Sequence, residues 1–240
     1  FTIATWFYMD TEQSNKRAMW SLGDRGLGGE HQRTVAANRP ICHLFVDANE
    51  KLNFIVSDPA TATNKRKWYT AANAISADQM HNVVVTYDGR LAGNSPVIYV
   101  DGVVKSLTED SSDQNFVMEA LQSNGGDSDF GIIIGGGPSS DSSNSHRTMF
   151  DTTFMECALW NKDLSDTEVA QVYAMGFMPN LASALGGFPN LDEGRIDSVD
   201  NLVSWWRMGD SEGDPQTDTD LRTSGSYDVS SPGVSAIRDV

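Results

Sequence analysis

Apolar and polar residues alternate over Phe150–Trp160, which predicts a β-strand in this stretch. Both faces of that strand carry apolar groups, so we expect both faces to be covered. A short helix is predicted near residues 165–175, because Ser165 can cap it and Glu168 stands three residues later, as in a capping box. Its apolar residues recur at helical spacing on the side expected to face the sheet: Val169, Val172 and Tyr173.

Alternating or β-branched segments predict further strands along the rest of the chain. They cover residues 1–9, 17–22, 41–46, 52–56, 68–70, 81–89, 97–104, 130–134 and 202–208. Residues 47–50 are expected to join one hairpin, and Asp101-Gly102 predicts a two-residue type I′ turn in another. The polar segments 61–67 and 108–129 are expected to lie at the surface. The pattern therefore predicts an all-β fold with one short helix.

Three groups of residues resemble the laminin G-like domains of the concanavalin A-like lectin and glucanase superfamily. The first is the opening Phe-Thr-Ile strand with Trp6-Phe7, and the second combines Val-Val-Val-Thr-Tyr-Asp-Gly at 83–89 with Ile-Tyr-Val-Asp-Gly at 98–102. The third comprises Trp160, Asn161, Leu164, Ser165, Glu168 and Val169. The resemblance covers roughly residues 1–177 and implies a two-sheet antiparallel jelly-roll sandwich.

The C-terminal part departs from the usual order of that family. Leu202–Met208 resembles the first strand of such a domain, which normally precedes the Phe-Thr-Ile strand. We therefore predict a jelly roll over 1–177, a connector over 178–200, and a C-terminal segment over 201–240. In that segment, the strand at 202–208 is expected to return to the same sandwich, beside Phe154–Trp160 or the N-terminal strand. An irregular acidic tail is expected to follow it.

The charge of the chain excludes several classes of partner. With 17 basic and 33 acidic residues, its formal net charge is −16. Binding to nucleic acid through phosphates, or to anionic lipid, is therefore not expected. No apolar run is long enough to span a membrane, so membrane insertion is not expected either. The sequence favours two buried free thiols at Cys42 and Cys157, with a disulfide between them as the alternative.

Carbohydrate binding needs exposed aromatic rings beside polar groups. The available rings are Trp20, Trp68, Tyr69 and Trp205, and the pair Trp68–Tyr69 follows a basic stretch. Ordinary packing is the alternative role for these side chains. Trp6, Trp160 and one of the pair Trp205/Trp206 are better explained as core residues, because strand alternation buries one residue of each neighbouring pair.

A calcium site is a second possibility, because hard cations need several oxygen ligands and the chain is rich in acidic loops. The candidate ligands are Asp47, Asn49, Asp127, Asp129, Asp210, Glu212 and Asp214. None of these groups matches the EF-hand pattern. The alternative is that they are solvated acids in turns.

Catalysis has little support in the sequence, and no catalytic residue is predicted. The four histidines lack metal-binding pair spacing, and His81 is expected to serve in surface or hairpin packing. No G-x-S-x-G motif occurs. Glucanases of similar fold carry alternating carboxylates on one strand, whereas Glu156 is the only acid of its strand, with Asp151 on the opposite face.

The sequence thus favours a non-enzymatic adhesion or assembly module. The sequence of residues 200–210 resembles domains in structural proteins of marine tailed bacteriophages. This resemblance implies that the chain is a head decoration or fibre on the virion exterior. The partners implied are other virion or surface proteins, further copies of the chain, and glycans. A secreted or cell-surface lectin module is the alternative, and a polysaccharide hydrolase or lyase is less favoured.

Overall fold

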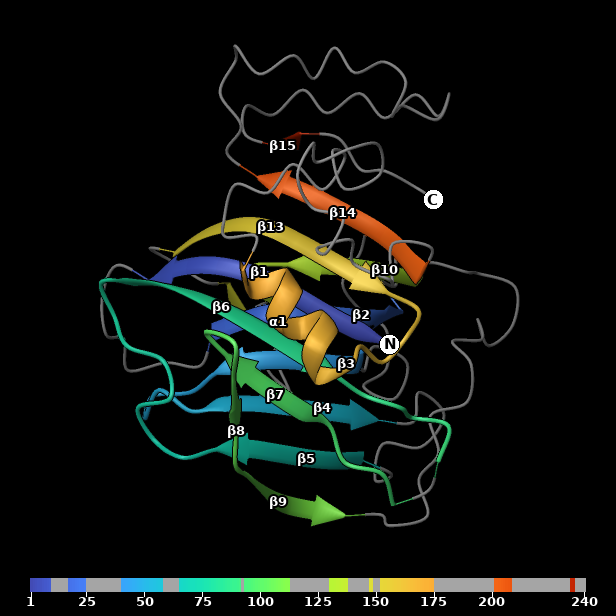
Figure 1. Ribbon diagram of the computed structural model, residues 1–240. Helices are drawn as coiled ribbons and strands as arrows, with labels where there is room; N and C mark the ends of the chain where they lie inside the picture. Colours follow the sequence, from blue (N-terminus) through green and yellow to red (C-terminus); the bar gives the residue numbers. More distant parts are fainter. Residues whose placement is uncertain are drawn as a thin grey trace, which may run out of the picture.

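The computed structural model shows two antiparallel β-sheets packed face to face, with one helix on the outside (Figure 1). The structure describes residues 1–9, 17–24, 40–57, 65–91, 93–112, 130–137, 147–148, 152–174, 201–208 and 234–235. All structural statements below concern these residues. The all-β, two-sheet jelly-roll sandwich expected from the sequence is confirmed.

The first sheet has seven strands in the order β15-β14-β13-β1-β6-β7-β8. Their bounds are β15 Val234–Ser235, β14 Leu202–Met208, β13 Thr152–Trp160, β1 Thr2–Met9, β6 Gln79–Thr86, β7 Val97–Val100 and β8 Val103–Lys105. The N-terminal strand therefore lies at the centre of this sheet, between two segments that are distant from it in sequence.

The second sheet has six strands in the order β10-β2-β3-β4-β5-β9. Their bounds are β10 Phe130–Ile134, β2 Arg17–Asp24, β3 Pro40–Val46, β4 Leu52–Ser57, β5 Lys65–Thr70 and β9 Leu107–Ser112. A small separate pair is formed by β11 Gly136–Gly137 and β12 Arg147–Thr148. After β8 the chain passes from the edge of the first sheet to the edge of the second, where β9 pairs with β5.

The main core fills the space between the two sheets, because alternate residues of each strand point inward. From the first sheet it receives Ile3, Phe7, Met9, Val83, Val85, Cys157 and Trp206. From the second it receives Trp20, Cys42, Leu44, Val46, Leu52, Phe54, Val56 and Trp68. Both cysteines are buried and free, as the favoured interpretation predicted. Burial raises the pKa of the Cys157 thiol to about 12, although a hydrogen bond with Thr5 lowers it in part.

The helix α1, Asp166–Ala174, covers the outer face of the first sheet (Figure 1). Val169 and Val172 are buried there in a second apolar cluster that also contains Ala4 and Trp160. No described helix is long and apolar enough to cross a membrane.

The predicted capping box is formed at the start of α1. Glu168 Oε2 accepts hydrogen bonds from the backbone amide and the hydroxyl of Ser165, both at 2.8 Å. Tyr173 packs on the sheet as expected, since its ring stacks on Trp6, yet the residue stays 38% exposed. The reason is its place over the turn glycine Gly102, at the margin of the packed surface.

The C-terminal strand β14 pairs antiparallel with β13, which is one of the two positions expected for it. Trp206 enters the main core, whereas Trp205 joins the cluster under α1. Both tryptophans are therefore buried, because this strand is covered on both faces. The domain boundaries predicted at residues 177 and 200 lie outside the described residues and stay a prediction.

Two segments expected to be polar surface segments contain strands. Residues 65–67, expected outside any strand, belong to β5, and Arg66 is fully buried. Its charge is tolerated there because Glu109 of β9 pairs with it at 2.8 Å. Residues 108–112, the start of the expected excursion 108–129, belong to β9, in which Thr108 and Asp110 are exposed as predicted.

Candidate functional site

Tyr69 is the sequence-predicted binding residue that the structure leaves accessible. Side chains of β5 alternate, so that Arg66, Trp68 and Thr70 point into the sandwich. Tyr69 is half-buried and lies on the outer face of the second sheet, between its register partners Asn53 and Thr108. Tyr69 therefore remains a candidate ring for a ligand.

Trp68 and Trp20 are corrected to core residues. Trp68 is fully buried, and its ring contacts Phe54 and Tyr87. Trp20 is also fully buried and packs edge-on against Trp206, with ring centroids 5.6 Å apart. Strand alternation turns both rings into the space between the sheets, so neither can offer a face to a sugar in this structure.

Two lysines surround the Tyr69 ring. The Lys51 ammonium lies 4.8 Å from the ring centroid, and that of Lys67 lies 5.5 Å from it. Lys67 also pairs with Asp110 of β9 at 2.9 Å. This hydrogen bond lowers the pKa of the Asp110 carboxyl. We call these four residues, Tyr69, Lys51, Lys67 and Asp110, the Tyr69 cluster.

The buried Arg66 anchors the strands on which the Tyr69 cluster stands. Its Nε donates to Glu109 Oε1 at 2.9 Å, and Nη1 donates to the backbone carbonyl of Asn94 at 2.5 Å. The guanidinium also lies over the Trp68 ring, 4.5 Å from its centroid. Because these contacts join β5, β9 and the loop before β7, the backbone under the cluster is held by several elements at once.

Asp47 is the predicted calcium ligand that the structure describes best, and it stabilises a turn. Its Oδ1 accepts the backbone amides of Asn49 at 2.9 Å and Lys51 at 3.2 Å, and Oδ2 accepts the amide group of Asn53 at 3.1 Å. Within the described ranges, no three His, Cys, Asp or Glu side chains gather as metal ligands. The other predicted ligands, Asp127, Asp129, Asp210, Glu212 and Asp214, lie outside the described residues.

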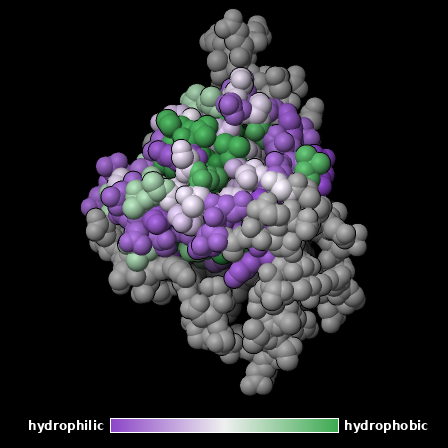
Figure 2. Space-filling view, turned by 90° about the horizontal axis from the view of Figure 1, so that it is seen from below, coloured by the Kyte–Doolittle hydropathy of each residue, from purple (hydrophilic) through white to green (hydrophobic). Residues whose placement is uncertain are grey.

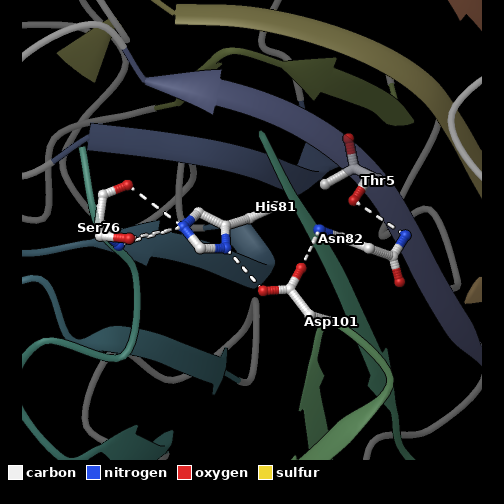
Figure 3. A network of polar contacts seen from close by, with 5 residues as sticks. All are labelled: Thr5, Ser76, His81, Asn82 and Asp101. Carbon is white, nitrogen blue, oxygen red and sulfur yellow. Dashed lines mark hydrogen bonds and ion pairs between the residues drawn. The ribbon is translucent and has the colours of Figure 1, made fainter. Parts of the chain in front are cut away.

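A polar network surrounds His81 on the first sheet (Figure 3). His81 Nδ1 lies 2.8 Å from Asp101 Oδ2, and Nε2 lies 3.1 Å from the Ser76 hydroxyl and 3.2 Å from the Ser76 backbone nitrogen. The second Asp101 oxygen accepts the backbone amide of Asn82 at 2.9 Å. The network ties the loop before β6 to the turn between β7 and β8.

The order of atoms resembles a Ser–His–Asp catalytic triad, but its hydrogen bonding suits a structural role. His81 Nε2, the atom that a catalytic histidine would use as a base, lies 3.2 Å from both the backbone nitrogen and the carbonyl oxygen of Ser76. In either tautomer of the ring, one of these backbone groups competes with the hydroxyl for Nε2. His81 is buried and contacts Asp101 of the β7–β8 turn, which agrees with the expected hairpin packing and not with a surface position. Its partners Ser76 and Asp101 could not be found from sequence spacing.

The turn that this network stabilises, Asp101-Gly102, leads into β8, the edge strand of the first sheet. Asp101 and Gly102 have φ angles of 53° and 73°, as the predicted type I′ turn requires. In β8, at the edge of the first sheet, Val103 is 60% and Val104 is 52% exposed. Figure 2 views the molecule from the side of β8 and β9 and shows hydrophobic residues gathered in a patch among hydrophilic ones.

Comparison with known proteins identifies one family and several distant folds. A laminin G model, described as the concanavalin A-like lectin/glucanases superfamily, matches residues 1–170. Among curated proteins, none matches the sequence.

Solved structures that resemble the chain include a Trypanosoma rangeli sialidase in complex with 2,3-difluorosialic acid, at 17% identity and a TM-score of 0.43. The match covers 74% of this chain but 23% of the sialidase, so the chain spans about a quarter of that enzyme's length. The CBM40 of a Ruminococcus gnavus sialidase, bound to α2,3-sialyllactose, matches at 13% identity and a TM-score of 0.46, over 72% of this chain and 81% of that one. The receptor-binding domain of botulinum neurotoxin type G matches at 12% identity and 0.42, over 72% and 37%.

Proposed function

The chain belongs to the concanavalin A-like lectin/glucanases superfamily, and we propose that it is a non-enzymatic carbohydrate-binding module. The observation that carries this proposal is the accessible Tyr69 ring on the outer face of the second sheet. The strand β9 beside Tyr69 supplies polar side chains, and the buried Arg66 links β9 to β5 from the inner face of the sheet. We place the ligand contact at the Tyr69 cluster.

The chemistry of this surface suits a sugar. An aromatic ring can pack against the C–H face of a pyranose while nearby polar groups bind its hydroxyls. Thr108 is exposed directly beside Tyr69 in the neighbouring strand, and Asp110 is exposed on the same strand. Hydroxyl, carboxylate and ammonium groups therefore surround one ring, and together they can donate and accept hydrogen bonds.

Among the described residues, this surface lacks the pair of carboxyl groups that a glycosidase uses. Glycoside hydrolysis uses two carboxyl groups on either side of the scissile bond. In the described part of the second sheet, Glu109 is next to Asp110 in sequence, but its carboxylate is taken up by the buried Arg66. The described residues beside the ring therefore offer one exposed carboxylate where hydrolysis uses two, and this is why we propose a module without catalysis.

The setting we propose is an exterior surface, and the virion exterior of a tailed phage is the first choice. Support for it comes from the resemblance of residues 200–210 to phage structural proteins. The open β8 edge with its two valines supports contacts with a protein partner or a second copy, because such edges pair readily with other strands. A secreted lectin is the alternative setting. Recovery of the protein from purified virions, in a fixed copy number, decides between them.

Calcium binding is proposed through the acidic sequence segments 127–129 and 210–214, whereas Asp47 is already engaged by the amides of its own turn. A bound ion stabilises the folded state by mass action. Millimolar calcium is then expected to raise the melting temperature above that measured in chelator. Equal melting temperatures in the two buffers contradict calcium binding by the folded protein.

Binding to a glycan array, followed by calorimetry with the best ligand, tests the proposal. Tyr69→Ala is expected to weaken binding about tenfold, which corresponds to roughly 1.4 kcal/mol. Tyr173→Ala is the matched control, because Tyr173 is another tyrosine with an accessible ring but lies over the first sheet. Loss of binding in both variants, or in neither, contradicts a site at Tyr69.

A further inference from the structure

We propose that the Tyr69 cluster selects acidic sugars, that is, saccharides that carry a carboxylate or sulfate group. This inference rests on the proposed carbohydrate-binding function and specifies its ligand class. The ligand is expected to place a ring face near Tyr69 and its anionic group between Lys51 and Lys67.

The first observation is a local reversal of charge. The chain as a whole has a net charge of −16, yet the outer face of β5 carries Lys65 and Lys67, with Lys51 next to them at the Tyr69 ring. Among the described residues, only Lys67 of these three has a carboxylate within 4 Å. Within the described ranges, Lys51 and Lys65 therefore have no carboxylate at ion-pair distance, although Lys65 also helps to lower the pKa of the Asp110 carboxyl.

The second observation is the way that Lys51 is held. Its ammonium lies 4.8 Å from the Tyr69 centroid, within the range of a cation–π contact. This contact positions the charge but satisfies none of its three N–H donors with an oxygen. A carboxylate or sulfate oxygen bound beside the ring would supply that acceptor.

The third observation is that the Lys67–Asp110 pair is easily replaced. The two side chains are 27% and 50% exposed, and exposed ion pairs of this kind contribute little to stability. Release of Asp110 to water therefore costs little when a ligand anion takes its place at Lys67. Until it is released, however, the Asp110 carboxylate repels that anion.

The inference makes an asymmetric prediction for the two partners of this pair. Removal of the Lys67 charge is expected to weaken binding of an acidic sugar. Removal of the Asp110 charge is expected to strengthen it, because the competing carboxylate is gone. A pair that only stabilises the fold would weaken binding in both variants, or change it in neither.

The experiment measures calorimetric affinity for two pairs of probes. One pair is a κ-carrageenan tetrasaccharide and its desulfated form, and the other is tetragalacturonate and its methyl ester. The acidic member of at least one pair is expected to bind about tenfold tighter than its neutral form, and to weaken as salt is raised. The pair that shows the difference identifies sulfate or carboxylate as the ligand group.

Variants complete the experiment. Lys51→Gln and Lys67→Gln are expected to remove most of the preference for the acidic probe, whereas Asp110→Asn is expected to increase its affinity. Lys105→Gln is the matched control, because Lys105 lies on β8 of the other sheet. Equal loss in Lys105→Gln contradicts the assignment of the preference to this cluster.

The failure of this inference differs from the failure of the proposed function. Acidic and neutral probes that bind equally, with both dependent on Tyr69, overturn the acidic-sugar inference and leave carbohydrate binding in place. Probes and array glycans that bind equally well to wild type and Tyr69→Ala overturn the site itself, and with it this inference.

Discussion

Nδ1 of His81 lies 2.8 Å from Oδ2 of Asp101, so that a core-facing residue of β6 fastens the turn between β7 and β8. The other Asp101 oxygen fixes the backbone amide of Asn82 at 2.9 Å. Asp101 has a φ angle of 53°, a left-handed conformation that costs free energy for a residue other than glycine. The network holds Asp101 in that conformation and thereby sets the position of the β8 edge.

Asp101→Ala is expected to destabilise the fold by about 2–3 kcal/mol, because it removes two charge-assisted hydrogen bonds and leaves alanine in a left-handed turn. Chemical denaturation measures the loss. Asp101→Asn is the matched control and is expected to lose less, since asparagine tolerates the conformation and can still accept from Asn82. Equal stability of wild type and Asp101→Ala contradicts the role of the network.

Ser165→Ala is expected to cost about 1 kcal/mol of unfolding free energy, because Ser165 and Glu168 form the cap of α1. A thermal melt measures the change. Thr167→Ala, at an exposed position in the first turn of α1, is a suitable comparison. A Ser165→Ala protein that melts with wild type shows that the cap does not contribute.

The lowered pKa of the Glu168 carboxyl predicts how the stability of the fold changes in acid. Burial alone would raise the pKa of its carboxyl, but hydrogen bonds from Lys162 and Ser165 outweigh burial and lower the pKa below 4.5. A carboxyl with a lowered folded-state pKa stabilises the fold above pH 4.5 and loses that contribution as the pH falls further. The stability difference between wild type and Glu168→Gln is thus expected to be constant near neutrality and to shrink below pH 4.5. A difference that stays constant down to pH 3 contradicts this.

Deletion of residues 201–240 is expected to give an aggregating protein. The deletion removes β14, which exposes the backbone edge of β13. It also removes Trp206 from the main core and Trp205 from the cluster beneath α1. Size-exclusion chromatography with light scattering reports the outcome, and a soluble, monomeric, cooperatively folding fragment 1–200 would show that β14 is dispensable.

Much of the fold could be predicted because its signals are local. The capping box at Ser165 and Glu168 depends on a spacing of three residues, and the turn at Asp101-Gly102 on two neighbouring residues. The position of β14 needed the family resemblance as well, since nothing near residue 202 specifies β13 as its partner.

The site was harder to predict because it depends on which face of a strand meets the other sheet. Trp68 and Tyr69 are adjacent in sequence, and alternation shows that they point in opposite directions but not which of them points inward. The burial of Arg66 was not predicted, because a basic segment is typical of a protein surface. Its partner Glu109 lies on β9, whose polar composition is not typical of a strand. Lys51 reaches Tyr69 across a strand pair, which no spacing in the sequence reveals.

The most direct test of the central claim is an NMR titration of the chain with the best glycan from the array. The account predicts that the shifted signals centre on the Tyr69 ring and extend to Lys51, Lys67, Thr108 and Asp110. Signals of the β7–β8 turn at Asp101 and Gly102 are expected to stay unchanged. Shifts that centre on that turn, or a saturable binding curve without any shift at Tyr69, would contradict the account.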